Sequence, residues 1–321
     1  MRTDKVVLIA GGAGSIGSAL AECLAKGGCD DLILLDKDEN SLELTRQRLE
    51  EIGYPKVLPL VCDIRNLQHL NRIFSHWQPD LVINAAAHKH VVSGQRNISE
   101  TTHNNLQLTL NLLKARHCNK HSVLVHVSTD KAVEPTSVMG ASKMLCESMV
   151  RTEYPQTQDR NYIIRFGNVM NTNGSVLQIW DRQFREGRPL TVTNLKMKRW
   201  MLPISDACDQ ILRVLGFDAG TYILDMGEMF SVGDILEKFL SERDVKDYPT
   251  RFLGMKPGEK EIEKLFWDCE EKKTFKAGTR QIIKVDNSPT FNYNRPLIVS
   301  GNFDDQQTLD CLVKIFEGLR A

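Results

Sequence analysis

Apolar residues follow two different spacings along the first half of the chain. Short, continuous apolar runs alternate with longer stretches in which apolar residues recur every three or four positions. The short runs are typical of buried parallel strands, and the longer stretches are typical of helices that pack on the faces of a sheet. We expect strands over residues 5–10, 32–35, 57–62, 81–87 and 123–127. This alternation predicts an α/β fold with a Rossmann-type, doubly wound parallel sheet.

The second half of the chain is less regular. Further apolar patterns predict strands over residues 161–166, 190–193, 221–225 and 281–285, and a closing amphipathic helix over 309–319. The segment at about 204–227 is predicted to return to the main sheet. We therefore expect a sheet domain over residues 1–167 and a smaller, interleaved C-terminal lobe that takes up most of residues 168–321.

Composition and charge narrow the possible partners. The 321 residues include 41 Lys and Arg and 41 Asp and Glu, so the net charge is zero. The composition therefore lacks the excess of positive charge that is typical of proteins that bind nucleic acid. No apolar run approaches the roughly 18 residues of a membrane-spanning helix, and the first residues lack a signal-peptide pattern. Eight scattered Cys show no metal-ligand spacing. We expect reduced thiols, no metal site and a cytoplasmic protein.

A glycine-rich turn follows the first expected strand. Gly11, Gly14 and Gly17 would let the backbone turn tightly, approach a pyrophosphate and pack the next helix on the strand. Asp36 ends the second strand, where a carboxylate would accept hydrogen bonds from an adenosine ribose and repel a 2′-phosphate. This spacing favours NAD over NADP. The alternative is a glycine-rich turn that binds no nucleotide.

A second group of polar residues follows the strand over 123–127. Thr129, Asp130 and Lys131 come at its end, and the helical pattern that follows contains Met139 and Lys143. An acid beside an amine at the end of a parallel strand is a catalytic arrangement if a cofactor lies across the strand ends. The alternative is a surface turn with two solvated charges.

Two basic segments leave several interpretations open. His88-Lys89-His90 follows the fourth strand, and it predicts a structural turn, a Lys89 that faces a diphosphate, or a metal site without a visible third ligand. Arg199 either pairs with a phosphate or belongs to a solvated basic run with Lys196 and Lys198.

With these motifs the chain resembles the extended short-chain dehydrogenases/reductases over nearly its full length. More narrowly, it resembles the bacterial nucleotide-sugar 4,6-dehydratases that act on UDP-N-acetylglucosamine-type sugars, in their soluble form. The motifs that carry this resemblance are Ala86-Ala87-His88-Lys89-His90-Val91, Ser128-Thr129-Asp130-Lys131-Ala132-Val133, Val138-Met139-Gly140-Ala141-Ser142-Lys143, Arg165-Phe166-Gly167-Asn168-Val169 and Gly254-Met255-Lys256-Pro257-Gly258-Glu259-Lys260.

The resemblance implies tightly bound NAD and a nucleotide-sugar substrate. In the family reaction, hydride moves from sugar C4 to NAD, C5 loses a proton, the C6 hydroxyl leaves as water, and hydride returns to C6. The 1–167 domain would then bind NAD, and the 168–321 lobe would bind the substrate. The implied catalytic residues are Thr129, Asp130, Lys131, Met139 and Lys143. The expected cofactor contacts are Gly11, Gly14, Ser15, Ile16, Gly17, Asp36, Asp63, Ile64, Ala85, Ala86, Asn105, Lys143 and Phe166. The expected substrate contacts are Lys89, Asn168, Ser175, Val176, Thr191, Arg199, Lys256 and Glu259.

Within that reaction, Lys131 suits the base at C5 and Asp130 suits the acid at C6. Their adjacency opposes both roles, because an ion pair stabilises the ammonium and the carboxylate, so desolvation by the bound sugar would have to prevail. Thr129 would hand the C4 hydroxyl proton to Asp130 or to water.

The chain departs from the family pattern at three places. Met139 stands where the superfamily has a catalytic Tyr, and a thioether cannot act as a base, although several of these dehydratases also have Met there. Lys256 replaces the usual Arg, which keeps the charge but loses the bidentate fork. The segment Val92-Ser93-Gly94-Gln95 stands where relatives commonly have Pro and an acidic residue. The last two changes bear on the identity of the substrate.

We therefore expect an NAD-dependent 4,6-dehydratase for an NDP-N-acetylhexosamine, with UDP-N-acetylglucosamine first and a GDP-linked sugar second. By resemblance, it would serve bacterial surface glycans or nonulosonic acids and form a homodimer or higher homo-oligomer through the helices over 99–118 and 139–152. The rival interpretations are a nucleotide-sugar 4-epimerase and a non-enzymatic NAD-binding protein.

Overall fold

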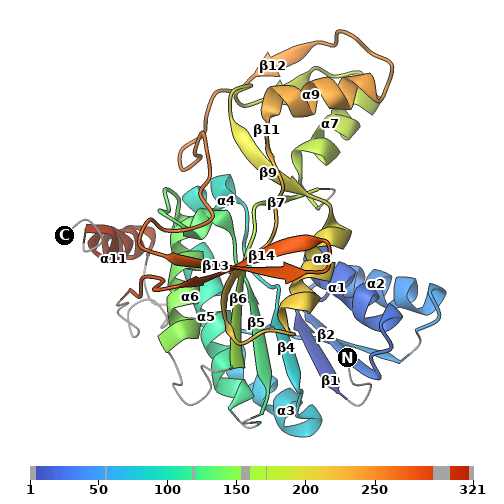
Figure 1. The fold of residues 1–321 in the computed structure, drawn as a ribbon, viewed down its shortest axis with the longest axis vertical. Coiled ribbons are helices and arrows are strands. Elements are labelled where there is room, and N and C mark those ends of the chain that lie inside the picture. Colours follow the sequence, from blue (N-terminus) through green and yellow to red (C-terminus); the bar gives the residue numbers. More distant parts are fainter. Residues whose placement is uncertain are drawn as a thin grey trace.

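The chain folds into a large sheet domain and a smaller lobe that stands beyond the carboxyl ends of the parallel strands (Figure 1). The computed structural model describes residues 5–54, 56–117, 119, 121–152, 160–170, 172–291 and 304–317. Within these residues no helix is both long and apolar enough to cross a membrane.

The sheet domain is built on nine strands, with parallel neighbours except at one edge. In spatial order they are β13 (Glu271–Ala277), β14 (Arg280–Asp286), β10 (Gly220–Ile223), β6 (Asn161–Arg165), β5 (Val123–Val127), β4 (Leu81–Asn84), β1 (Val6–Ala10), β2 (Asp31–Asp36) and β3 (Val57–Val61). The order β3-β2-β1-β4-β5-β6 is that of a Rossmann fold, in which the direction of winding reverses between β1 and β4. The predicted fold class is confirmed.

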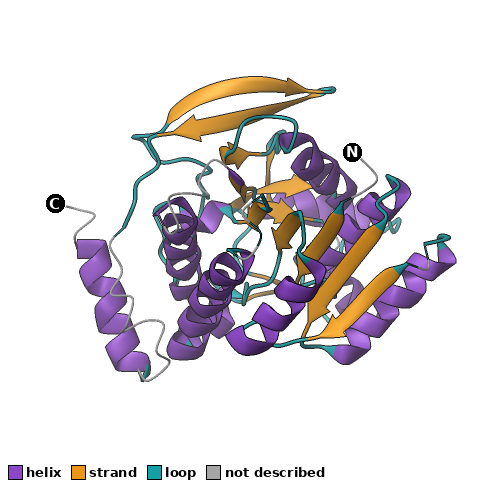
Figure 2. Cartoon of the chain, turned by 90° about the horizontal axis from the view of Figure 1, so that it is seen from below, coloured by secondary structure: helices purple, strands orange, loops and turns teal. Residues whose placement is uncertain are grey.

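Helices cover both faces of this sheet, as Figure 2 shows. One face carries α1 (Ser15–Lys26), α2 (Glu39–Glu51) and α8 (Ile204–Val214). The other carries α3 (Leu67–Trp77), α5 (Ile98–Arg116), α6 (Val138–Thr152) and α11 (Asp305–Glu317), with the short α4 (Val91–Arg96) beside α5 and α6. Alternate residues of β1 point to opposite faces: Val7 and Ile9 pack in the first core, and Leu8 and Ala10 in the second. A strand buried on both faces reads as a continuous apolar run, which is why the sequence pattern predicted it.

The smaller lobe has its own apolar core, made by residues such as Trp180, Leu190 and Phe239. Its elements are β7 (Asn168–Val169), α7 (Val176–Arg185), β8 (Leu190–Val192), β9 (Lys198–Leu202), β11 (Met229–Ser231), α9 (Val232–Ser241) and β12 (Thr250–Phe252). β8 pairs with β12, and β9 lies between β7 and β11.

The chain passes between the two parts repeatedly. It enters the smaller lobe after β6, returns through α8 and β10, enters again at β11, and comes back to the sheet at β13 (Figure 1). The hairpin of β13 and β14 extends the main sheet, although the sequence analysis placed most of residues 168–321 in the lobe. β14 pairs antiparallel with β10, a long-range pairing that no local pattern reports. The closing helix begins at Asp305, and the predicted end at residue 319 lies outside the described residues.

A buried ion cluster joins the β13–β14 hairpin to β6 and α6. Arg165, at the end of β6, is fully buried and donates to both carboxylate oxygens of Glu147 on α6, at 2.7–3.1 Å. It also donates to both oxygens of Glu270, just before β13, at 2.7 and 2.9 Å. Burial would raise the pKa of Glu147, but the charge of Arg165 and its hydrogen bonds outweigh burial and hold that pKa at about 2.

Removal of this guanidinium should destabilise the fold. Arg165→Leu leaves the carboxylates of Glu147 and Glu270 buried without their shared cation, so we expect a loss of about 3–5 kcal/mol in the free energy of unfolding, measured with urea at pH 7. Arg185→Leu, which removes an exposed partner of Asp181, should cost no more than about 0.5 kcal/mol.

The same cluster predicts a pH dependence. The folded pKa of Glu147 lies below its value of roughly 4.3 in an unfolded chain, so its contribution is present above that pH and is lost as the pH falls toward 2. The difference between the wild type and Arg165→Leu should therefore shrink over this range. A difference below about 1 kcal/mol at pH 7 would show that the fold does not depend on the cluster.

Candidate active site

The glycine-rich turn brings the start of α1 against the ends of β1 and β4. Gly11 has a φ of +79°, and a Cβ at this position would lie 2.7 Å from the backbone nitrogen of Ala86. A Cβ on Gly17 would lie 2.1 Å from the carbonyl oxygen of Gly11. Only glycine permits this approach, and it leaves a hollow of 160 Å³. Its lining includes Gly11, Gly14, Asp36, Asp63, Ile64, Ala85 and Ala86.

Asp36 and Asp63 stand at the ends of neighbouring strands, on the wall of this hollow. The Asp36 carboxylate accepts hydrogen bonds from the backbone nitrogens of Ala13 and Asp38, both at 3.1 Å. Asp63 binds the Arg65 guanidinium, and this hydrogen bond lowers the pKa of Asp63. Asp36 is thus held beside the glycine turn, where the sequence predicted a ribose partner.

A second hollow of 340 Å³ continues from the first toward the smaller lobe, and the two share Ala85, Ala87 and His88. It is bounded by the ends of β4, β5 and β6, by the start of α6 and by the loop before α7. The predicted site residues in its lining are Ile16, Ala85, Lys89, Thr129, Lys131, Met139, Lys143, Phe166, Asn168, Ser175 and Val176. Residues far apart in the chain therefore meet at the carboxyl edge of the sheet, at its topological switch point.

The turn after β5 presents the hydroxyl of Thr129 and the amine of Lys131 to this hollow, with the carboxylate of Asp130 behind them. Thr129 Oγ1 donates to Asp130 Oδ1 at 2.9 Å, and Lys131 Nζ donates to the same oxygen at 2.9 Å. Lys131 Nζ also donates to Asn168 Oδ1 at 3.3 Å. Asp130 is fully buried behind Thr129 and Lys131, and its Oδ2 accepts no hydrogen bond from any described residue. The pair is therefore not a solvated turn: its carboxylate is enclosed, and its amine lines the hollow with a side chain that is 21% exposed.

Lys143 lies at the floor of the hollow, one helical turn after the buried Met139. Its Nζ donates to the carbonyl of Val127 at 2.6 Å and lies 3.1 Å from Nε2 of the fully buried His126. Burial lowers the pKa of Lys143, and burial together with the nearby Lys143 lowers the pKa of His126 well below its usual value.

The neutral His126 also fixes the orientation of Asn84. If Nε2 accepts from Lys143, Nδ1 carries the proton, and it lies 3.1 Å from the Asn84 side chain. The other amide atom of Asn84, Oδ1, has no partner among the described residues. Exchange of the two amide positions lets Asn84 Oδ1 accept from Nδ1, and it moves Nδ2 away from Thr109 Oγ1, which lies 3.5 Å from it in the present orientation.

The loop before α7 closes the hollow toward the glycine turn. Lys89 Nζ donates to the carbonyl of Asn173 at 3.0 Å, and the backbone nitrogen of Asn173 donates to Ser15 Oγ at 2.9 Å. Burial lowers the pKa of Lys89. In the described part of the chain, no three His, Cys, Asp or Glu side chains are grouped to hold a metal ion.

Several predicted contacts lie outside the two hollows. Asn105 is buried beneath them, where it binds the backbone of His88 and the hydroxyl of Ser142. Thr191 binds Gln183 inside the smaller lobe, and Glu259 accepts from the backbone nitrogen of the exposed Lys256. These side chains are used for local structure.

Arg199 also has a different role from the predicted phosphate contact. Its guanidinium donates to the carbonyls of Lys198, Lys260 and Glu261 at 2.8–3.1 Å. It therefore fastens the loop after β12 to β9. Neither a free phosphate ligand nor a solvated basic run describes this arrangement.

Two residues near the site were missed by the sequence analysis. Glu263 is buried, with Oε1 3.8 Å from Lys131 Nζ. His126 was missed although a histidine in the middle of an apolar strand is a recognisable signal. Glu263 offered no such signal, because it lies in a run of charged residues that is typical of an exposed loop.

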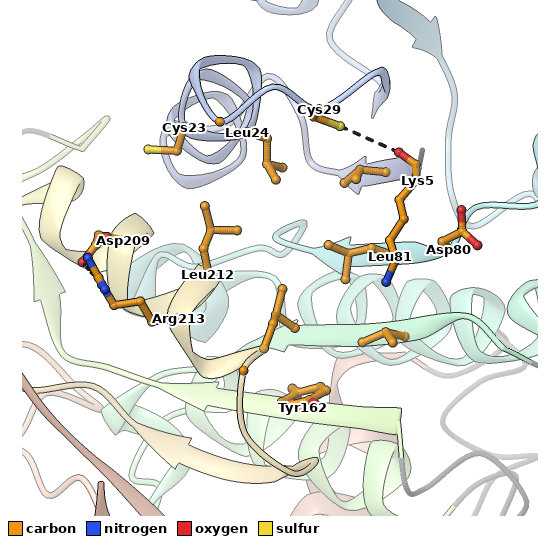
Figure 3. Close-up of a pocket in the computed structure, with 15 residues that line it drawn as sticks. Lys5, Cys23, Leu24, Cys29, Asp80, Leu81, Tyr162, Asp209, Leu212 and Arg213 are labelled. Atoms are coloured by element: carbon orange, nitrogen blue, oxygen red, sulfur yellow. Dashed lines mark hydrogen bonds and ion pairs between the residues drawn. The ribbon is translucent and has the colours of Figure 1, made fainter. Parts of the chain in front are cut away.

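A larger cavity of 570 Å³ lies at the opposite edge of the sheet, between α1 and α8 (Figure 3). Its walls are mainly apolar side chains such as Leu24, Leu81 and Leu212, with Lys5 and Asp80 at its rim. It contains the amino ends of β1, β4 and β5 and none of the residues predicted for a site. In open α/β sheets ligands bind at the carboxyl ends, so the two smaller hollows are the candidate site.

Comparison with known sequences finds relatives over most of the chain. The family of polysaccharide biosynthesis proteins matches residues 7–285. The capsular polysaccharide biosynthesis protein CapD of Staphylococcus aureus is 32% identical over 270 residues, which are 82% of this chain and 45% of CapD. The chain thus spans less than half the length of that relative. A UDP-glucose 4-epimerase of Rickettsia rickettsii is 30% identical over 278 residues, 83% of this chain and 78% of the epimerase.

Solved structures share the architecture. Pen from Bacillus thuringiensis superposes with a TM-score of 0.81 at 27% identity, over 92% of this chain and 90% of Pen. The dTDP-glucose 4,6-dehydratase DesIV from Streptomyces venezuelae, solved with NAD, has a TM-score of 0.71 at 23% identity, over 81% and 88% of the two chains. The second likeness concerns the fold alone. The fold of the chain is related to that of nucleotide-sugar dehydratases and epimerases. Because the polysaccharide biosynthesis protein family matches residues 7–285, the chain belongs to that family.

Proposed function

We propose that this protein is an NAD-dependent 4,6-dehydratase of an NDP-N-acetylhexosamine, with UDP-N-acetylglucosamine the favoured substrate and a GDP-linked sugar the second. One observation carries the proposal. Thr129, Asp130 and Lys131 form a chain of hydrogen bonds at the end of β5, with Thr129 and Lys131 in the lining of the hollow beside Lys143. A hydroxyl, an acid and an amine in contact are the groups that loss of water next to a ketone requires.

The two joined hollows suit an extended dinucleotide. Gly11, Gly14 and Ala86 leave space for a pyrophosphate at the amino end of α1, and Asp36 would bind the adenosine ribose. Ile16, Lys143 and Phe166 would hold the nicotinamide half in the second hollow. NAD bound there would supply a hydride acceptor for C4 and a hydride donor for C6.

The proton of the C4 hydroxyl leaves through Thr129 in this mechanism. Thr129 Oγ1 accepts that proton and passes its own to Asp130 Oδ1, 2.9 Å away. Asp130 thereby becomes a neutral acid, and it then gives this proton to the C6 hydroxyl as water leaves. Because the resulting 4-ketone acidifies C5, the amine of Lys131 removes the C5 proton and returns a proton to C5 as hydride reaches C6.

The missing Tyr is compatible with this route. Met139 lies in the hollow and accepts no proton, and Lys143 is held by Val127 and His126. The C4 proton therefore has Thr129 as its acceptor. On the smaller-lobe side, Lys89, Asn168 and the amino end of α7 at Ser175 and Val176 would face the sugar and its diphosphate.

A nucleotide-sugar 4-epimerase is the second candidate, because an enzyme of that name is 30% identical to this chain. An epimerase needs the ketone step but has no use for an acid at C6 or a base at C5. The pair of Asp130 and Lys131 therefore favours the dehydratase. By its resemblance to the dehydratases, we infer a cytoplasmic homodimer or higher homo-oligomer that supplies surface glycan or nonulosonic acid synthesis.

Incubation with NDP-sugars and NAD tests the proposal. We expect UDP-N-acetylglucosamine to lose one water, seen by mass spectrometry, and the product to incorporate deuterium at C5 from deuterated water. An altered sugar of unchanged mass would establish the epimerase instead. No conversion across UDP- and GDP-linked sugars would leave an NAD-binding protein without this activity.

Substitution of the proposed base sharpens this test. Lys131→Ala should reduce C5 exchange by at least about a hundredfold, the usual range for loss of a general base, while NAD affinity stays within about twofold. Lys196→Ala, an exposed lysine on the smaller lobe, is the matched control and should retain full exchange. Exchange that survives in Lys131→Ala would place the base elsewhere.

The cofactor assignment predicts a change in selectivity. Asp36→Ala removes the carboxylate that would bind the ribose diol and repel a 2′-phosphate, so NAD affinity should fall about tenfold and the preference for NAD over NADP should narrow. Calorimetric titration of both dinucleotides measures the two constants. An unchanged ratio would remove Asp36 from the cofactor site.

A further inference from the structure

A segment from the smaller lobe is fastened across the turn after β5 that contains Thr129, Asp130 and Lys131, here called the catalytic turn. Residues 254–265, here called the strap, run from β12 toward β13 along the outside of the turn that follows β5. Lys260 Nζ donates to the carbonyl of Val133 at 2.7 Å, and Thr136 Oγ1 donates to the carbonyl of Gly258 at 3.1 Å. The strap therefore reaches the residues immediately after Lys131.

Glu263 is the residue of the strap that lies next to Lys131. It is 4% exposed, and its Oε1 lies 3.8 Å from Lys131 Nζ. Its Oε2 lies 3.4 Å from Lys260 Nζ but accepts no hydrogen bond from any described residue. A buried carboxylate with an unsatisfied oxygen is costly unless another role compensates for it.

The surroundings of Lys131 create a difficulty for a base. As an ammonium, Lys131 is stabilised by Asp130 at 2.9 Å and by Asn168 at 3.3 Å. An ammonium cannot remove a proton from C5, so its own proton must first go to another group. Asp130 is not available for this, because in the proposed mechanism it holds the C4 proton that later leaves with the C6 hydroxyl.

We propose that Glu263 is a positioning residue that takes the proton Lys131 must lose before it can act as the base. This inference rests on the proposed dehydratase function. The proton moves from Lys131 Nζ to a Glu263 oxygen, and both groups become neutral without a change in total charge. Lys131 then takes the C5 proton, its ammonium hydrogens exchange with water, and it returns a proton to C5. At the end of the cycle it regains its own proton from Glu263.

Burial favours this internal transfer. Glu263 is 4% exposed, and a proton taken from Lys131 removes the charge of this buried carboxylate. Besides Lys131, the charged group beside Glu263 is Lys260 on the strap. Asp130 shares Lys131 with Glu263, and the more exposed Lys264, one residue along the strap, pairs with Glu134. When Asp130 becomes protonated, Lys131 loses its nearest counter-ion, so C4 oxidation itself promotes the transfer.

The pH profile of C5 exchange tests the inference. In the wild type the transfer is internal, so the exchange rate should be flat between about pH 7 and 9. In Glu263→Gln, an isosteric change, Lys131 must lose its proton to solvent. We expect a rate about a hundredfold lower at pH 7 that rises about tenfold per pH unit.

Two variants of the strap control for structural damage. Glu263→Asp keeps a carboxylate and should keep the flat profile, at a lower rate. Glu261→Gln changes an exposed acid two residues away and should behave as the wild type. A Glu263→Gln profile that is lowered but still flat would mean a purely structural role and would overturn the inference.

A second measurement does not depend on activity. Competitive acetylation of the amines of the folded apo-protein, followed by peptide mass spectrometry, reports how readily each Lys loses its proton. Loss of a carboxylate 3.8 Å from Nζ should make Lys131 in Glu263→Gln react about tenfold faster, relative to the exposed Lys256 on the same strap.

The two measurements separate the possible failures. If no NDP-sugar is converted but Lys131 reactivity rises in Glu263→Gln, the proposed function is wrong and the coupling between Glu263 and Lys131 stands. If Lys131 reactivity is unchanged in Glu263→Gln, the inference is wrong, whatever the substrate.

Discussion

Arg165 is the buried charge on which the rest of the structure depends. Its guanidinium is shielded from water, so carboxylates from two distant segments must pair with it. Glu147 brings α6 against β6, and Glu270 brings the start of the β13–β14 hairpin to the same point. Ser128, the residue before Thr129, donates to Glu147 at 2.6 Å. One ion cluster therefore fixes both the C-terminal edge of the sheet and the base of the catalytic turn.

The strap holds the same turn from the opposite side. Arg199 fastens the strap to β9, and Lys260 fastens it to the catalytic turn, so the smaller lobe and the sheet domain meet at Lys131. Residues that would hold a sugar nucleotide come from both parts, with Lys89 from one and Asn168 from the other. The position of the Lys131 amine thus depends on how the smaller lobe packs on the sheet. Substrate contacts made by the lobe would therefore affect the group proposed to remove the C5 proton.

The sequence predicted the parts of this molecule that rest on local patterns. Gly11 and Gly17 were informative because backbone contact excludes every other residue there, and the strand before Thr129 was visible as an apolar run. A strand over 281–285 was predicted, but its pairing with β10 was not, because no local pattern reports it. The contacts of Arg165 with Glu270 and of Lys131 with Glu263 were not predictable either, because they join polar residues more than a hundred positions apart that pair only after folding. Charged residues between 254 and 270 resemble a solvated loop in sequence. The bonds of Arg199 to the carbonyls of Lys260 and Glu261 were not predictable, because they too form only after folding.

The absence of a Tyr bears on which reaction suits the site. With Met139 in that place, Lys143 contacts a carbonyl and a neutral imidazole, and Thr129 is a hydroxyl in the lining of the hollow that is hydrogen-bonded to a buried acid. The hydrogen bond of Thr129 runs to Asp130, so a proton that leaves C4 through it arrives beside Lys131. In an epimerase that proton must return to the same oxygen, which makes a second acceptor redundant. In a dehydratase the proton leaves with another hydroxyl, and an enclosed acid that stores it next to the base is what that transfer needs.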